Sequence, residues 1–101
     1  MSRDEIIALL QAHRDELRSV GVVGVSLFGS MARGEKTAQD IDVAVRLAKE
    51  FSRPGFDYFG RLEALEEQLR KLLGCEVDLV EEPVRRERLQ REIDKDRAVA
   101  F

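Results

Sequence analysis

The sequence is poor in the residues that build covalent cross-links and zinc sites. Its 101 residues include one cysteine, Cys75, and one histidine, His13. A single cysteine cannot form an internal disulfide, and this pair is too small for the four-ligand cluster of a structural zinc site. We therefore expect any bound metal to be held by oxygen ligands.

Long apolar runs are also missing. No apolar stretch approaches the roughly 18 residues of a membrane span, and the first residues lack the apolar core of a signal peptide. These absences predict a cytoplasmic protein without a membrane association. The charged fraction of 37% and the hydrophobic fraction of 44% are those of a folded protein. The length suits one domain, residues 1–101, with one core.

A basic surface is a third absence. The formal net charge is −3, and no segment is basic enough to neutralise several phosphates in a row. Proteins that grip nucleic acid usually carry such a patch, so we do not expect a nucleic-acid partner.

Three aspartates stand out in what is present. Asp40 and Asp42 flank Ile41 at the start of an apolar run, and Asp78 lies in a second apolar run. Successive side chains of a β-strand alternate between faces, so Asp40 and Asp42 would share one face. At an effective dielectric of about 20, like charges ~4 Å apart repel by about 4 kcal/mol. A site built from three carboxylates therefore needs divalent cations or raised pKa values, and the pattern indicates metal-assisted phosphoryl transfer.

A Gly29-Ser30 pair precedes these aspartates, at a predicted junction of strand and helix. Glycine lets a phosphate approach the backbone closely, and amide groups at the start of a helix favour anions. The alternative is an ordinary turn in which Ser30 caps the helix. Arg33 is a candidate for bidentate phosphate binding, or it pairs with Glu35 or an aspartate of the site.

The periodicity predicts an α+β fold in which helices cover a small mixed β-sheet. Residues 22–28 and 40–47 should form antiparallel neighbouring strands because the link between them is short. Opposite charges should pair along the last helix, Glu82 with Arg86 and Glu87 with Arg91. The expected helices cover residues 2–21 (opened by a capping box of Ser2 and Glu5), 30–33, 62–72 (ended by Gly74) and 84–93, with a third strand at 75–80.

The segment 27–34, LFGSMARG, followed by Asp40-Ile41-Asp42-Val43, resembles the G-S-x-A-R-G … D-x-D signature of minimal nucleotidyltransferase (MNT) domains. These domains belong to the DNA polymerase beta superfamily, and the resemblance covers nearly the whole chain. It implies the nucleotidyltransferase fold and the transfer of a nucleoside monophosphate, AMP from ATP, to a hydroxyl group. It also implies two Mg²⁺ ions, or Mn²⁺, held by Asp40, Asp42 and Asp78, and a general-base role for Asp78. Glu76 shares the strand face of Asp78 and is the competing ligand.

Stand-alone domains of this size resemble the antitoxins of HEPN/MNT toxin–antitoxin pairs. That resemblance implies a protein adenylyltransferase with an all-helical HEPN partner, and a homo-oligomer is a further option. One rival is a module that sequesters its partner without catalysis, and another is a subunit that modifies a small molecule of the aminoglycoside type. Met31 and Gln39 depart from the family pattern, which often has a basic residue and a serine there, and this questions how tightly the triphosphate is held.

Overall fold

The computed structural model describes residues 1–35, 40–51 and 57–101. Gln39, one of the two departures from the family pattern, lies outside them. In chain order the described elements are α1 (Arg3–Ala12), α2 (Arg14–Ser19), β1 (Val22–Phe28), α3 (Gly29–Ala32), β2 (Asp40–Leu47), α4 (Tyr58–Leu73), β3 (Glu76–Glu81), α5 (Glu87–Asp96) and β4 (Ala98–Val99).

The four strands form one mixed sheet in the order β3-β2-β1-β4. β1 pairs antiparallel with both β2 and β4, whereas β2 and β3 are parallel. The predicted α+β class with a small mixed sheet is confirmed, and so is the antiparallel pairing of residues 22–28 with 40–47. A parallel neighbour requires a crossover, and α4 supplies it.

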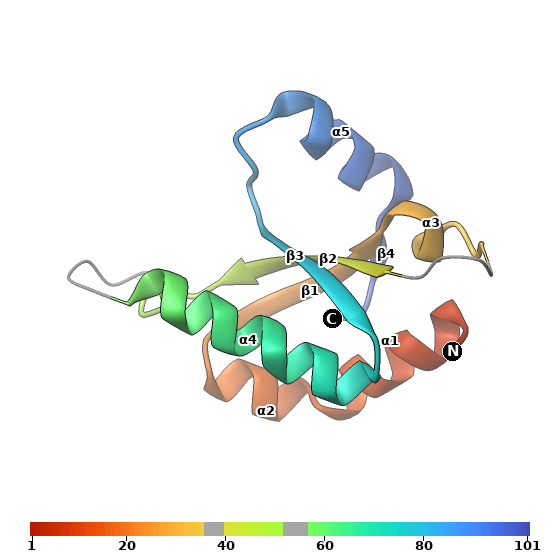
Figure 1. The fold of residues 1–101 in the computed structure, drawn as a ribbon. Coiled ribbons are helices and arrows are strands. Elements are labelled where there is room, and N and C mark those ends of the chain that lie inside the picture. The colour runs from red at the N-terminus through yellow and green to blue at the C-terminus, as the bar shows by residue number, and fades with distance from the viewer. Residues whose placement is uncertain (36–39, 52–56) are drawn as a thin grey trace.

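One face of the sheet carries the main core and is covered by α1, α2 and α4 (Figure 1). Helix α4 turns Leu65, Leu69 and Leu73 inward at helical spacing, and Gly74 ends it in the left-handed region at φ 69°. Ile41 and Val43 of β2 are buried in the same core. No described helix is long and apolar enough to cross a lipid bilayer.

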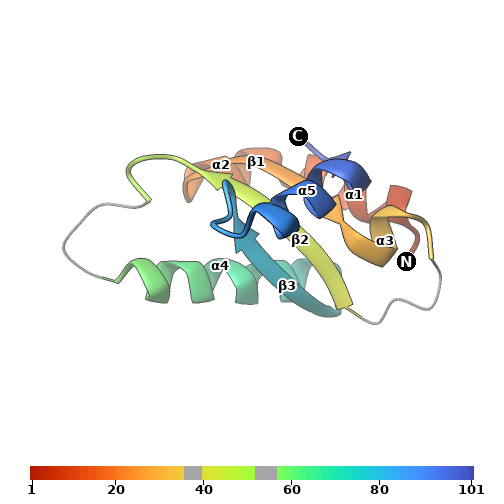
Figure 2. The same cartoon turned by 90° about the horizontal axis from the view of Figure 1, so that it is seen from above.

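The opposite face is covered only in part, by α5, which crosses above β1 and β2 (Figure 2). A small cluster of Phe28, Ala44 and Ile93 lies beneath this helix. Because side chains alternate along a strand, Asp42 points to the same face as Ala44. One face of the sheet is therefore apolar and covered by helices. The other face carries polar side chains, among them Asp42, at one end of the sheet.

The predicted helix over residues 2–21 is wrong in one respect, since it is two helices. Half of the predicted capping box is confirmed, because Ser2 Oγ accepts a hydrogen bond from the backbone N–H of Glu5 at 3.2 Å. The Glu5 carboxylate accepts from Ser2 Oγ at 3.1 Å and not from the Ser2 backbone. At His13 the backbone leaves helical geometry, and Nδ1 of the ring lies 3.0 Å from the carbonyl oxygen of Leu9. The apolar periodicity hides this break because Leu17 still reaches the core.

The C-terminal segment departs further from the prediction. Helix α5 begins at Glu87, so Glu82 lies outside it and pairs with Arg97 instead of Arg86. Within the described part of the chain, Glu87 and Arg91 do not form the predicted ion pair. The short strand β4 was not predicted, because a two-residue strand has no periodicity to detect.

Candidate active site

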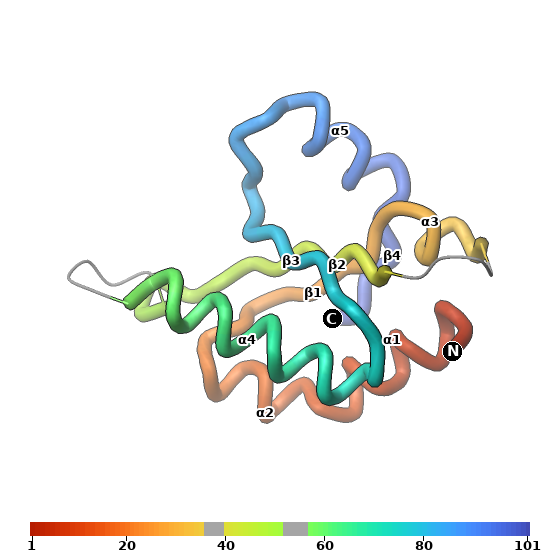
Figure 3. Tube along the Cα trace, in the orientation of Figure 1, coloured from red at the N-terminus to blue at the C-terminus, as the bar shows by residue number. Residues whose placement is uncertain are grey.

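Three neighbouring strands bring Phe28, Asp42 and Asp78 into one row across the sheet. Phe28 of β1 is the register partner of Asp42 in β2, which is in turn the partner of Asp78 in β3. Gly29 follows Phe28 directly and opens α3. The tube view shows α3 at the end of β1, beside the start of β2 (Figure 3). Residues from three separate segments of the chain thus meet at one end of the sheet.

Gly29 is required by its conformation and by its neighbour. Its φ is 73°, in the left-handed region that side chains disfavour. A Cβ atom there would stand 3.3 Å from Cγ of Asp42 and would overlap Oδ2 of the same carboxylate. The structure thus shows the Asp42 carboxylate packed against the turn at Gly29, while the close approach of a phosphate there stays a prediction.

The electrostatics of Asp42 reflect a crowded acidic site. Burial raises the pKa of this carboxyl most, and the charges of Asp78 and Asp40 raise it further. A hydrogen bond between the Asp42 and Asp78 carboxyls acts in the same direction, while the positive charge of Arg33 opposes it. Two carboxylates held this close together repel each other, and a bound cation would relieve that repulsion.

The donor set fits a hard divalent cation, which prefers carboxylate oxygens. The Asp42–Asp78 pair supplies adjacent oxygens, and Asp40 lies near enough to raise the pKa of Asp42. Among residues 1–35, 40–51 and 57–101, however, no three His, Cys, Asp or Glu side chains are already grouped as a metal site. The site of three carboxylates therefore stays a prediction. The structure places two of them, Asp42 and Asp78, next to each other.

Glu76 is a weaker candidate than Asp78 for the third metal ligand. It pairs in register with Asp40, two residues along the strand from the row of Asp42 and Asp78. Its Oε2 accepts a hydrogen bond from Nε of Arg70 at 3.1 Å, so its carboxylate is engaged with α4. The register therefore favours Asp78 as the partner of Asp42.

Ser30 is the second residue of α3 and does not cap it. The N-cap is Phe28, without a side-chain hydrogen bond, so the interpretation of Ser30 as an ordinary capping serine is wrong. Within the described part of the chain, its hydroxyl donates no hydrogen bond. It remains a candidate donor to a phosphate, as predicted for Gly29 and Ser30 together.

Arg33 ends α3 and is engaged by two carboxylates. Its Nη1 donates to Oδ2 of Asp96 at 2.7 Å, and its Nη2 donates to Oε2 of Glu35 at 3.3 Å. The hydrogen bond to Asp96 is the largest cause of a raised Arg33 pKa, followed by the charge of Glu35. The expected alternative of pairing with Glu35 is seen, but the shorter contact, to Asp96, was not predicted.

Sequence analysis also missed what holds α5 onto the sheet. Arg97 donates to both carboxylate oxygens of Glu82, at 2.8 and 2.5 Å, and to Oγ of the buried Ser26 at 3.0 Å. These partners lie 15 and 71 residues away along the chain. A lone arginine after a helix carries no signal of such contacts, so only the fold reveals them.

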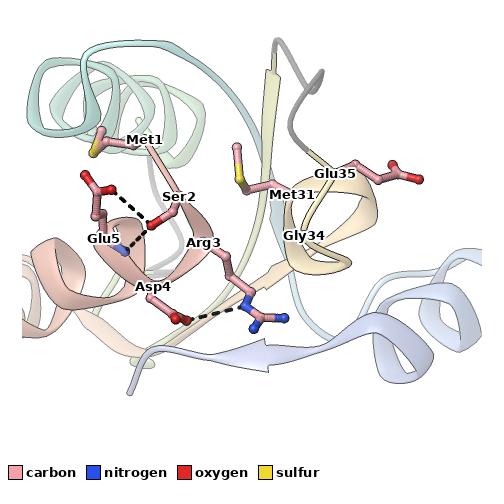
Figure 4. Close-up of a pocket in the computed structure, with 8 residues that line it drawn as sticks. All are labelled: Met1, Ser2, Arg3, Asp4, Glu5, Met31, Gly34 and Glu35. Atoms are coloured by element: carbon pink, nitrogen blue, oxygen red, sulfur yellow. Dashed lines mark hydrogen bonds and ion pairs between the residues drawn. The ribbon is translucent and has the colours of Figure 1, made fainter.

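A cavity of about 560 Å³ lies apart from this row of residues, between the start of α1 and the end of α3 (Figure 4). Its lining includes Arg3, Met31 and Gly34 but none of the three aspartates. Met31, the other departure from the family pattern, is 8% exposed and belongs to the core. Position 31 therefore serves packing in this chain.

Comparison with known proteins settles the family. The sequence profile of the nucleotidyltransferase domain matches residues 10–101. The chain belongs to this family. A relative from Methanocaldococcus jannaschii, named as a candidate protein adenylyltransferase, is 40% identical over 78 residues, which are 75% of this chain and 74% of the relative.

Two solved structures share the fold of this nucleotidyltransferase domain. A candidate minimal nucleotidyltransferase superposes with a TM-score of 0.72 at 28% identity, covering 97% of this chain and 95% of the other. A toxin–antitoxin structure with AMP-PNP superposes with a TM-score of 0.65 at 27% identity, covering 100% of this chain and 73% of the other. The nucleotidyltransferase fold expected from the GS … DxD motif is confirmed.

Proposed function

We propose that this nucleotidyltransferase transfers AMP from ATP to a hydroxyl group of a partner protein, and that the partner is an all-helical HEPN toxin. The observation that carries the proposal is the row of Asp42 and Asp78 beside the turn at Gly29, which joins paired carboxylates to a candidate phosphate cradle. The M. jannaschii relative and the toxin–antitoxin structure with AMP-PNP support the substrate and the partner.

The residues of the turn and of α3 bind the triphosphate. The backbone at Gly29 and the hydroxyl of Ser30 bind the triphosphate at the start of α3. Arg33 adds a guanidinium that donates to phosphate oxygens. These contacts fix the α-phosphorus and hold the pyrophosphate in position to leave.

The acidic residues would hold the metal ions and receive the proton of the acceptor. Asp40, Asp42 and Asp78 would hold Mg²⁺, which neutralises the triphosphate charge and polarises its oxygens when bound. Asp78 takes the proton of the acceptor hydroxyl as its oxygen forms a bond to the α-phosphorus. The bond from this phosphorus to the bridging oxygen breaks, and pyrophosphate leaves with the electron pair.

The test uses ATP labelled at the α-phosphate, the purified chain and an all-helical HEPN protein as the acceptor. Label should move to the partner with the wild-type chain and fail to move with an Asp40/Asp42 double mutant. A growth assay runs in parallel, with the toxin expressed together with either form. Rescue that persists in the double mutant, without labelled partner, would contradict the enzymatic account and favour sequestration by contact.

A further inference from the structure

The guanidinium of Arg33 is held by a residue that the family motif does not contain. Asp96, which binds it at 2.7 Å, is the last residue of α5 and lies 63 positions further along the chain. The contact joins α3, which carries the Gly29-Ser30 turn, to the helix that covers the same face of the sheet. The end of α5 therefore reaches the candidate phosphate site.

The two partners differ in exposure. The Asp96 side chain is 12% exposed, while that of Arg33 is 49% exposed. A guanidinium has five N–H donors. One binds Asp96 and one binds Glu35, and the others meet no acceptor among the described residues. The mostly buried carboxylate thus fixes one edge of a half-exposed guanidinium, whose remaining N–H groups have no acceptor within the described part of the chain.

Asp96 is itself fixed in place by its neighbour. Arg97 binds Glu82 and the buried Ser26, which ties the end of α5 to β1 and to the segment after β3. An anchor that is held rigidly can define the position of a flexible arginine. Such preorganisation lowers the side-chain entropy lost when the arginine binds a ligand.

We propose that Asp96 is a positioning residue, which orients Arg33 so that its outward N–H groups meet the phosphates of the nucleotide at the start of α3. The inference rests on the proposed function for the identity of the nucleotide. The rival explanation is that the ion pair only fastens α3 to α5. In that case its loss lowers stability and leaves nucleotide affinity unchanged.

The experiment compares Asp96→Asn and Asp96→Glu with Asp94→Asn as the matched control. Asp94 lies on the same helix and is 59% exposed, but it binds Arg97 and Gln90 and does not contact Arg33. The readouts are the melting temperature, the Kd values for a non-hydrolysable ATP analogue and for adenosine, and KM and kcat for AMP transfer. Adenosine reports on binding that does not involve phosphates.

Asp96→Asn should raise the Kd of the ATP analogue and the KM for ATP by about fivefold or more, which corresponds to a loss of about 1 kcal/mol in binding. The Kd for adenosine should stay unchanged. Asp96→Glu should recover part of the loss, because it keeps the charge, and Asp94→Asn should match the wild type. An unchanged Kd for the analogue in Asp96→Asn would overturn the inference.

A double-mutant cycle tests whether Asp96 acts through Arg33. In an Arg33→Ala background, Asp96→Asn should cause no further loss of analogue binding, because the group it orients is gone. Losses that add in full would overturn the inference. A wild-type chain that binds the analogue but transfers no AMP would contradict the proposed function alone, whereas one that binds no analogue would contradict both.

Discussion

A side chain at position 29 and the carboxylate of Asp42 would occupy the same space. Gly29 adopts φ 73°, and a Cβ built on it would overlap Oδ2 of Asp42. The turn that opens α3 and the central aspartate of the site are therefore a matched pair. The glycine of the motif is explained by this packing as well as by any need to admit a phosphate.

Gly29→Ala should destabilise the fold more than Gly74→Ala does. Both glycines have a positive φ, so both substitutions carry a conformational cost of about 1–2 kcal/mol. Only the change at 29 also displaces a carboxylate, since no atom lies within 4 Å of a Cβ at Gly74. Urea denaturation of the two variants measures the difference. Equal losses of stability would show that Asp42 does not pack against the turn.

Asp42→Asn should abolish AMP transfer and leave the fold as stable as the wild type or slightly more stable at pH 7. The folded-state pKa of Asp42 is raised, so the stability linked to this group is fully present below its ordinary value of 3.8 and is lost as pH rises through the folded value. Asparagine does not ionise, so the Asp42→Asn variant does not lose this stability as pH rises. Its advantage over the wild type, measured by urea denaturation, should therefore shrink as pH falls toward 4. Near-normal transfer by this variant would show that Asp42 is not essential.

The ion pair of Glu82 and Arg97 should stabilise the fold with a pH dependence opposite to that of Asp42. Its hydrogen bonds to Arg97 lower the pKa of Glu82 below its ordinary value of 4.5. The contribution is thus fully present above 4.5 and is lost as pH falls through the lower folded value. Arg97→Ala should cost about 3 kcal/mol at pH 7, because it leaves a carboxylate that is 8% exposed without its cationic partner and with only the Gln90 amide still donating to it.

The difference in unfolding free energy between wild type and Arg97→Ala should narrow as the solution is acidified below pH 4.5. Arg88→Ala is the control, since Arg88 is 88% exposed and its contact with Glu92 is long, at 3.7 Å. A surface pair of this kind contributes little. A wild-type advantage that stays constant down to pH 3 would contradict the linkage.

Local signals in the sequence were enough to predict the two central strands and the aspartates they carry. The strands at 22–28 and 40–47 have the predicted bounds, since alternating β-branched residues and the Gly29 and Asp40 boundaries are local signals. The face shared by Asp40 and Asp42 follows from strand alternation. Asp78 was placed by a family resemblance and an apolar run, and the parallel register with Asp42 supports that placement.

The contacts of α5 could not be predicted in the same way. Asp96 contacts Arg33, and Arg97 contacts Glu82 and Ser26, across long separations in the sequence. Charges at four-residue spacing favoured the local pair of Glu82 with Arg86, but Glu82 lies before α5 and pairs with Arg97 instead. Long-range polar contacts carry no periodicity, so the sequence alone misses them.

Magnesium with ATP should raise the melting temperature of the wild-type chain. Binding at ten times Kd adds about 1.4 kcal/mol, which corresponds to roughly 5 °C or more for a domain of about 100 residues. The shift should be lost in Asp42→Asn and reduced in Ser30→Ala, which removes a phosphate donor. No shift with magnesium or manganese and ATP at millimolar concentration would count against the site.

The central claim is tested most directly by the intact mass of the HEPN protein after its expression together with this chain. The account predicts a partner that carries the added mass of one or more AMP groups with the wild-type chain. It predicts an unmodified partner with Asp42→Asn, even though the two proteins still copurify. A partner of unmodified mass that is nonetheless neutralised by the wild-type chain would contradict it.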